Sequence, residues 1–450
     1  MRIAWFSPFP PVRTGIADCS AELVAALRGR GHDIHPYPAE SAHDFPWTHR
    51  RRPYDLIVYQ FGNSSHHDYE WAYALRYPGL VVLHDTCLHH ARAAFLLRER
   101  RPDDYRAEFA WSHPDAPRDA AELAVAGLDS RLFYAWPMIR ALTESALLVA
   151  THGAASAVPS LASRRPVSIR LGHGAFVAPD AARAARARVR ARYGIADTDV
   201  LFGVFGGLTP EKRLVQVLGA LRAVVPYAAS ARLLLSGARA AHFDLDAAIE
   251  AHGLADRVLV TGYLPEQDLT DHLAACDVSL NLRWPSAGET SGAWLRALAA
   301  GVPTIITDLA HLADVPSLDP RTWAVRPSAA RAPLSASRTP RSAAGSQGPV
   351  TVAIDILDED HSLRMAMRRL ALDPNLRAEL GSNGQAWWQR EHSLAAMVED
   401  YETLFGMLGA GAGRQVSEPR AAGDVPAHLR AAGDGKLRAL LEPFGVASPI

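Results

Sequence analysis

The sequence contains almost no lysine. Of its 47 basic residues only Lys212 and Lys436 are lysines, and all the others are arginines. This bias, together with abundant alanine, is typical of a GC-rich genome in which arginine replaces lysine wherever a planar, delocalised cation serves. A lysine that remains is a candidate for a role that needs a compact point charge. Lys212 is therefore singled out before any motif is considered.

Other absences narrow the class of protein. The three cysteines, Cys19, Cys87 and Cys276, lack metal-ligand spacing and predict buried, reduced thiols in a cytoplasmic protein. The N-terminal segment has no basic region followed by an apolar run, which predicts that there is no signal peptide. No apolar run reaches the roughly 18 residues that a membrane span needs. A formal net charge of -1 argues against a broad nucleic-acid surface.

The length of 450 residues and the hydrophobic content of 48% predict more than one core. Short β-branched or aromatic runs alternate with helical patterns, which is typical of parallel βαβ units. The expected strands are 2–6, 55–61, 79–84, 146–151, 166–171, 199–207, 231–237, 257–262, 277–282 and 303–307. We therefore predict an α/β fold in which two Rossmann-like, doubly wound domains, 1–177 and 178–390, face a central cleft.

Four segments are expected outside these two cores. Polar residues 96–125 predict an excursion or lid on the first domain. The Ala-, Ser-, Pro- and Arg-rich stretch 326–349 predicts a flexible insertion in the second domain. Residues 391–408 predict a helix that packs back toward the N-terminal domain, and residues 409–450 predict a mostly flexible tail.

Ligands of doubly wound sheets bind beyond the carboxyl ends of the strands, so the loops there form the candidate site. After the first strand, Gly15 opens a helix whose amides can meet an anion, although an ordinary βα turn explains this glycine equally well. The stretches "YQFGNSSHHD" and "VVLHDTCLHH" place four polar residues at the cleft: Gln60, Asn63, His84 and Asp85. The histidines and cysteine there fit no dependable metal-ligand spacing, so we expect sugar contacts and no metal.

The loop "FGGLTPEKR" at 205–213 predicts a phosphate site. Its glycines end a strand, and a helix is expected to begin near Pro210, with Lys212 and Arg213 in its first turn. Two cations at the positive end of a helix dipole indicate an anion between them, and a diphosphate would suffice. A solvated basic pair is the alternative.

The stretch "RWPSAGETSGAWLRALAAG" at 283–301 predicts a second helix N-terminus that holds an anion. Thr290 or Ser291 is the expected N-cap, and Gly292 permits a ligand to approach the first amides. Glu289 is then the carboxylate that points into the cleft, where it can accept hydrogen bonds from sugar hydroxyls. A capping acid that offsets the helix dipole is the alternative for Glu289.

Together these loops resemble glycosyltransferase family 4, the retaining sugar-nucleotide transferases of GT-B fold, over most of residues 1–408. The resemblance implies that the loop around Gly15 faces the donor diphosphate and that "LHD" supplies His84 to the donor sugar. "TGYLPEQDLTDHLAACDVSLNL" is similar to the family's base-binding turn, which implies that Tyr263 and Leu264 lie at the nucleobase.

A family turn of the form "GRLxxEKG" supplies an arginine and a lysine to the diphosphate. The corresponding "GGLTPEKR" keeps Lys212 but has Gly207 where the arginine is expected. Arg213 is the candidate substitute, from a different direction.

The Glu-x7-Glu motif of the family is also altered, to a "GETSG" variant. Alignment on "ALAAG" puts Gly288 and Arg296 at the two glutamate positions and displaces Glu289 by one residue. The second glutamate is the residue that contacts the ribose in the family, and an arginine thus stands at its position. Glu289 and the amides of Thr290 to Gly292 are still expected to hold the donor sugar and phosphate.

The resemblance implies a hexosyltransferase that moves a sugar from a nucleoside diphosphate to a glycan, lipid-linked or small-molecule acceptor, as in bacterial polysaccharide biosynthesis. The implied catalytic residues are Lys212, Glu289 and His84. The implied donor-binding residues are Gly15, Gly207, Lys212, Arg213, Tyr263, Leu264, Glu289, Thr290, Ser291 and Gly292. Gln60, Asn63 and Asp85 are expected on the acceptor or sugar side. No cofactor or metal is expected, because cations and helix dipoles stabilise the leaving diphosphate.

Three alternatives remain open at this point. A non-catalytic GT-B partner that binds a sugar nucleotide would tolerate the altered motifs, and a sugar-nucleotide epimerase or a phosphorylase would share the fold. A periplasmic binding protein also has two Rossmann-like lobes but requires a signal peptide. The expected location is cytoplasmic, and contact of residues 96–125 with the inner face of a membrane is the alternative to a solvated lid.

Overall fold

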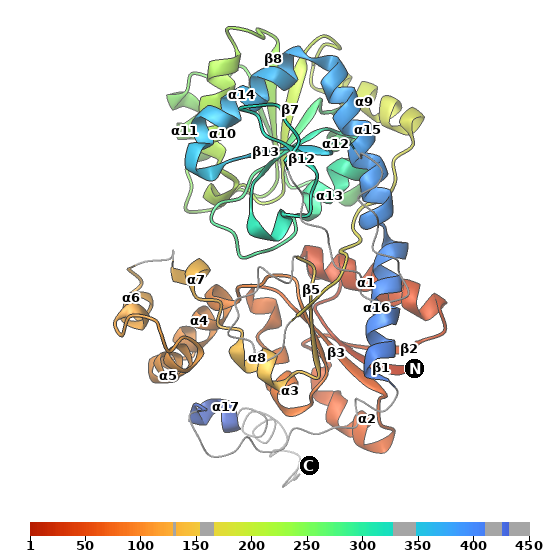
Figure 1. Ribbon diagram of the computed structural model, residues 1–450, viewed down its shortest axis with the longest axis vertical. Helices are drawn as coiled ribbons and strands as arrows, with labels where there is room; N and C mark the ends of the chain where they lie inside the picture. The colour runs from red at the N-terminus through yellow and green to blue at the C-terminus, as the bar shows by residue number, and fades with distance from the viewer. Residues whose placement is uncertain (129–131, 154–165, 327–347, 410–424, 432–450) are drawn as a thin grey trace.

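The computed structural model describes five stretches of the chain: 1–128, 132–153, 166–326, 348–409 and 425–431. Figure 1 shows two α/β lobes stacked along the long axis of the molecule, each with helices around its own sheet. The predicted α/β fold of two doubly wound domains is confirmed. The insertion expected at 326–349 and the tail expected at 409–450 lie almost entirely outside the described residues.

The N-terminal domain contains a parallel six-stranded sheet in the order β2-β1-β3-β4-β5-β6. Its strands are β1 (Arg2–Phe6), β2 (Asp33–Tyr37), β3 (Leu56–Phe61), β4 (Leu80–Leu83), β5 (Leu148–Thr151) and β6 (Val167–Ser168). The runs "RIAWF", "LIVYQF" and "LVVL" are buried throughout, as expected when helices cover both faces of a parallel sheet. The strand order reverses between β1 and β3, so the loops after these strands diverge and open a crevice.

Helices of the N-terminal domain cover its sheet and also form an excursion. The covering helices are α1 (Gly15–Gly29), α2 (Phe45–Arg51), α3 (Glu70–Arg76) and α8 (Arg140–Ser145). The excursion contains α4 (His89–Arg98), α5 (Pro102–Ser112), α6 (Ala120–Val125) and α7 (Leu132–Ala135), and it is wider than the expected 96–125. It has a small core of its own around Leu96, Tyr105 and Phe109, which keeps these helices together beside the main sheet.

The C-terminal domain contains a parallel seven-stranded sheet in the order β12-β13-β11-β10-β7-β8-β9. Its strands are β7 (Val200–Phe205), β8 (Ala231–Ser236), β9 (Val258–Gly262), β10 (Val278–Asn281), β11 (Thr304–Thr307), β12 (Ser317–Leu318) and β13 (Thr351–Ile354). Its helices are α9 (Pro179–Arg192), α10 (Leu214–Val224), α11 (Leu245–Ala251), α12 (Glu266–Ala275), α13 (Gly292–Ala299), α14 (Glu359–Leu372) and α15 (Pro374–Glu391). Strands β2, β12 and β13 were not among the predicted strands; β2 contains a proline and β12 has only two residues.

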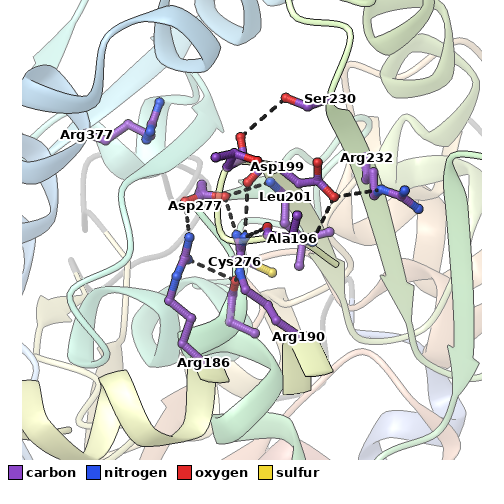
Figure 2. Close-up of polar contacts among 12 residues, drawn as sticks. Arg186, Arg190, Ala196, Asp199, Leu201, Ser230, Arg232, Cys276, Asp277 and Arg377 are labelled. Atoms are coloured by element: carbon purple, nitrogen blue, oxygen red, sulfur yellow. Dashed lines mark hydrogen bonds and ion pairs between the residues drawn. The ribbon is translucent and has the colours of Figure 1, made fainter. Parts of the chain in front are cut away.

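A buried ion-pair cluster fastens α9 to the amino edge of this sheet (Figure 2). Arg190 is 1% exposed, and its Nη2 lies 2.5 Å from Asp277 Oδ2. Arg186 pairs with the other oxygen of Asp277 at 2.8 Å, and the amide of Leu201 in β7 donates to Oδ2 at 2.7 Å. Because Asp277 immediately precedes β10, the cluster stabilises one edge of the sheet and leaves the carboxyl edge for ligands.

Helix α16 (Leu394–Leu408) returns from the C-terminal domain and packs on α1 of the N-terminal domain (Figure 1). Asp400 accepts hydrogen bonds from the backbone amide, Nε and Nη2 of Arg170, at 2.8, 2.9 and 2.6 Å. Both side chains are buried, so this ion pair fixes the helix against the N-terminal sheet. In the described parts of the chain, none of the helices is long and apolar enough to cross a membrane.

Candidate active site

The loops after β4 and β10 touch each other where the carboxyl edges of the two sheets face. The amide of Cys87 donates to the carbonyl of Ala287 at 2.9 Å, and the Thr86 hydroxyl reaches the same carbonyl at 3.3 Å. Gly288 has a φ of +81°, and a Cβ there would lie 2.0 Å from Thr86 Oγ1. Glycine at 288 therefore permits this contact between the lobes both by its backbone conformation and by its lack of a side chain.

Charged side chains from both lobes gather around this contact. Glu289 Oε1 forms an ion pair with Arg283 Nε at 2.6 Å, and Glu289 Oε2 accepts a hydrogen bond from the Ser286 hydroxyl at 2.8 Å. Asp85 lies opposite in the N-terminal lobe, where burial and the charge of Glu289 raise the pKa of its carboxyl to about 7. The predicted residues Asp85 and Glu289 are thus brought together, but Glu289 already has two protein partners.

Lys212 lies in a short 3₁₀ turn, Pro210–Lys212, at the carboxyl end of β7. Its ammonium is close to Gly206, because a Cβ built on that glycine would lie 3.4 Å from Nζ. Burial, followed by the charge of Arg283, lowers the pKa of Lys212 to about 7. Within the described residues Lys212 has no ion pair or side-chain hydrogen bond, so its ammonium is available to a ligand.

Two expectations for this loop require correction. The helix does not begin near Pro210, because Arg213 has a left-handed φ of +58° and α10 starts at Leu214. Arg213 also does not face the diphosphate position. Its guanidinium binds both oxygens of Glu359 in α14, with Nε–Oε1 at 2.8 Å and Nη2–Oε2 at 2.5 Å. The left-handed residue turns this side chain toward α14, so its charge is neutralised there.

Gly207 lies exposed at the end of the same loop. A Cβ on Gly207 would meet only Thr209 Cγ2, at 3.8 Å, so no close packing requires glycine at this position. The loop therefore supplies one cation, Lys212, toward the cleft.

The N-terminus of α13 is capped as the sequence predicts, but its surroundings differ. Ser291 Oγ accepts from the amide of Trp294 at 3.3 Å, and the Thr290 hydroxyl donates across the lobes to the carbonyl of His152 at 3.3 Å. A Cβ on Gly292 would lie 2.8 Å from His173 Cδ2. Packing against His173 therefore also requires glycine at 292, and the approach of a ligand to the first amides of α13 stays a prediction.

Arg296, in α13, forms an ion pair with Glu266 at the start of α12. Its Nε and Nη2 lie 2.7 and 2.6 Å from the two carboxylate oxygens of Glu266. Arg296 also contacts His173. Burial, followed by the charge of Arg296, lowers the pKa of His173 to about 3, so this imidazole is neutral.

The loop after β1 meets the turn after β9 across the cleft. Thr14 caps α1 by accepting from the amide of Ala17 at 3.1 Å, and the space beside Gly15 is open. The guanidinium of Arg13 lies 5.4 Å from the ring centroid of Tyr263, which is 59% exposed, and Leu264 follows it half-buried. The loops that carry the predicted donor residues Gly15, Tyr263 and Leu264 therefore approach each other, and their contact with a donor stays a prediction.

His84 and Gln60 belong to a hydrogen-bond network with α16. Gln60 is 1% exposed, and its Oε1 accepts from His84 Nε2 at 2.7 Å and from the Tyr401 hydroxyl at 3.2 Å. Burial, with His152 next in effect, holds the pKa of His84 well below its usual range, so the ring is neutral. His84 stays half-buried at the strand end, whereas the expectation that Gln60 faces the cleft is wrong because Tyr401 covers it.

Asn63 organises the loop rather than presenting its side chain to the cleft. Its Oδ1 accepts from the amide of Ala91 in α4 at 2.9 Å, and its own amide donates to Asp85 Oδ2 at 2.6 Å. Asn63 therefore orients Asp85 through its backbone amide, and a direct sugar contact of its side chain stays a prediction. No group of three or more His, Cys, Asp or Glu side chains in the described residues is arranged to hold a metal ion.

A comparison with known protein families finds a match for part of the C-terminal lobe. Residues 199–332 match the family described as "Glycosyl transferases group 1". Over these residues the C-terminal domain is similar to the group 1 glycosyltransferases, which confirms the resemblance inferred from the loops. The two-lobed fold is that of solved GT-B glycosyltransferases.

Three solved structures match nearly the whole length of both chains. They are the catalytic domain of starch synthase IV from Arabidopsis thaliana bound to ADP and acarbose (TM-score 0.60, 12% identity, 92% of this chain and 99% of that chain), sucrose-phosphate synthase from Thermosynechococcus elongatus (0.59, 15%, 91% and 99%) and HepE from Anabaena in complex with UDP and glucose (0.58, 16%, 91% and 100%). At these identities the likeness establishes the fold alone.

One curated relative matches part of the chain. It is the 2-deoxystreptamine glucosyltransferase of Streptomyces kanamyceticus, 29% identical over 143 residues, which are 31% of this chain and 36% of that protein. The chain therefore matches about a third of this relative's length.

Sequence reasoning missed Arg283 as a site residue. It is the first residue of the stretch "RWPSAGETSG", two positions after β10, and the available signal was its place beyond the carboxyl end of a central strand. Its ion pair with Glu289 depends on the loop doubling back over six residues, which no local pattern indicates.

Proposed function

We propose that this protein transfers a sugar from a nucleoside diphosphate donor to an acceptor in the cleft between the lobes. The observation that carries the proposal is Lys212, which lies after β7 and forms no ion pair in the described residues, although the charge of Glu289 acts on its pKa. Its pKa is lowered to about 7 because burial and Arg283 disfavour the charge, and a bound diphosphate would restore it. The group 1 glycosyltransferase domain at 199–332 and the GT-B fold support the same reading.

The donor extends across the cleft between groups from both lobes. Tyr263 and Leu264 border the nucleobase end, Lys212 meets the diphosphate, and Glu289 with Thr290 lies at the sugar. HepE was solved with UDP and starch synthase IV with ADP, so these likenesses leave the base of the donor undecided. The acceptor is a glycan, lipid-linked or small molecule that enters beside His84 and Asp85, and the expected location is cytoplasmic.

The chemical step requires stabilisation of a leaving diphosphate. Fixed cations and helix N-termini supply this stabilisation without reorganising, and the departing phosphate accepts the acceptor's proton on the same face of the sugar. Retention of configuration then requires no enzymic nucleophile and no metal. The contact between Thr86 and Ala287 brings the lobes together over the site and limits hydrolysis of the donor by water.

The experiment measures release of the nucleoside diphosphate from UDP-glucose, ADP-glucose and GDP-mannose, with and without a mixed acceptor pool. We expect one donor to be consumed by the wild-type protein, and Lys212→Ala to reduce that rate by at least about a hundredfold, as loss of one preorganised charge does elsewhere. A folded Lys212→Ala variant with wild-type turnover would refute the assignment.

A non-catalytic partner that binds a sugar nucleotide is the second candidate. It is favoured by Gly207 and Arg296, which replace side chains that the related motifs use. Such a protein would bind a nucleoside diphosphate yet release none from any donor, which separates the two candidates in the same assay. A same-fold epimerase would release nucleotide or a new sugar without any acceptor.

A further inference from the structure

A donor diphosphate carries at least two negative charges, and Lys212 supplies one positive charge. The neighbouring arginines are already paired in the structure. Arg213 binds Glu359 through two nitrogens, and Arg296 binds Glu266 in the same way. Arg283, on the loop after β10, pairs with its carboxylate through Nε alone, so it is the candidate for a second cation.

Arg283 is held beside the turn that contains Lys212. Its backbone amide donates to Thr307 Oγ1 at 3.1 Å, and the next amide, of Trp284, donates to the carbonyl of Glu211 at 2.8 Å. These two hydrogen bonds join the loop after β10 to the ends of β11 and β7. The position of residue 283 is thus fixed by backbone contacts on both sides.

The side chain of Arg283 is oriented by a single carboxylate. Glu289 pairs with Nε, and Glu289 is itself held by the Ser286 hydroxyl. Within the described residues the ion pair between Nε and Glu289, at 2.6 Å, is the one polar contact of the Arg283 side chain, which is 36% exposed. Its guanidinium end thus retains donors that the protein does not use.

The charge of Arg283 acts on the groups on both sides of the cleft. It contributes to the lowered pKa of Lys212 and acts against the raised pKa of Asp85 in the opposite lobe. Two neighbouring cations repel each other unless an anion lies between them. The carboxylate of Glu289 offsets part of this repulsion, since it pairs with Arg283 and acts against the lowered pKa of Lys212, and a diphosphate that bridges Arg283 and Lys212 would offset the remainder.

We propose that Arg283 is the second cation of the diphosphate site and that Glu289 positions it there. The inference rests on the proposed function and adds a binding residue on a different loop from Lys212. An arginine suits this place because its planar fork donates two parallel hydrogen bonds to phosphate oxygens. Glu289 then orients Arg283 and also binds the sugar. Arg283 and Ser286 do not use all of its oxygen lone pairs, and the remaining ones can accept a hydrogen bond from a sugar hydroxyl.

The test is a calorimetric titration of each variant with the nucleoside diphosphate that binds the wild-type protein, and with the corresponding nucleoside. Arg283→Gln should weaken diphosphate binding at least about tenfold, as expected for a charged hydrogen bond, and leave nucleoside binding unchanged. Arg283→Lys should restore most of the lost diphosphate affinity, because lysine keeps the positive charge. This variant also provides the test if Arg283→Gln folds poorly.

Arg213→Gln is the matched control, because it removes an arginine whose Nη2 lies 2.5 Å from a different carboxylate, that of Glu359, in the same lobe. It should lower the thermal midpoint and leave diphosphate affinity within about twofold, because Glu359 already neutralises the charge of Arg213 in the folded protein. Wild-type diphosphate affinity in Arg283→Gln, or an equal loss for nucleoside and diphosphate, would overturn the role of Arg283. Absence of diphosphate binding by the wild-type protein would instead refute the proposed function itself.

Discussion

The surroundings of Lys212 disfavour the positive charge of its ammonium. Burial and Arg283 lower its pKa to about 7, whereas the lysine of an unfolded chain titrates near ~10.4. Between these values the unfolded chain binds the proton and the folded chain does not, so this group makes the protein more stable as the pH rises from about 7 to about 10. Below about pH 7 both states are charged and the full cost of burying the ammonium is present.

The same pKa predicts a pH dependence of diphosphate binding. Below about pH 7 the free protein already carries the charge on Lys212, and above it the bound anion must draw a proton from solution. We expect affinity to fall as the pH rises above 7, and binding at pH 8 to take up a proton. Calorimetric titration in two buffers of different ionisation enthalpy measures that proton. No uptake at pH 8 would show that Lys212 does not meet the ligand.

At the scale of elements, α16 depends on one buried ion pair. Asp400 is the main partner of Arg170, while Glu399 contacts the same guanidinium at 3.3 Å from a half-exposed position. The hydroxyl of the next residue, Tyr401, also bonds Gln60 beneath His84. Helix α16 thus links the C-terminal lobe to the residues that lie beneath His84 in the N-terminal lobe.

We expect Asp400→Ala to lower the free energy of unfolding by about 3–5 kcal/mol, because it leaves the buried guanidinium of Arg170 without its main counter-ion. Glu399→Ala is the control and should cost less than about 1 kcal/mol, as an exposed partner does. Urea denaturation of both variants measures the difference. Equal costs for the two substitutions would contradict the burial argument.

Local patterns predicted the elements well, and distant contacts explain the errors. The strands "RIAWF" and "LIVYQF" are apolar throughout because both faces of a parallel sheet are covered, which a short window reveals. Arg213 was misplaced because its partner, Glu359, lies 146 residues further along the chain. Gln60 was misplaced because Tyr401, 341 residues away, covers it. Capping by Ser291, a contact over three residues, was among the predicted alternatives.

At the scale of the whole molecule, the site exists only where the lobes meet. Asp85 and His84 come from one sheet, and Lys212, Arg283 and Glu289 come from the other. The direct contact of Gly288 with Thr86 sets how closely these groups approach. Transfer should therefore depend on this contact more strongly than donor binding does, because binding uses mainly the second lobe.

We expect Gly288→Ala to reduce the transfer rate at least tenfold more than diphosphate affinity, because a Cβ 2.0 Å from Thr86 Oγ1 forces the lobes apart. Gly31→Ala is the control, since that glycine also has a positive φ, +91°, but open space around it. Gly31→Ala should lower the free energy of unfolding without changing the ratio of transfer rate to diphosphate affinity. Small-angle scattering should detect a larger radius of gyration for Gly288→Ala alone.

The central claim is that the cleft binds a nucleoside diphosphate through Lys212. The most direct measurement is a thermal-shift series with UDP, GDP, ADP and dTDP, with and without magnesium, on the wild-type protein and on Lys212→Met. A ligand at about 100 times its dissociation constant adds roughly 2.7 kcal/mol to the free energy of unfolding, which is a clear shift in midpoint. We predict that one diphosphate stabilises the wild-type protein without magnesium and leaves the midpoint of Lys212→Met unchanged. No shift with any of the four, or an equal shift in the variant, would contradict the account.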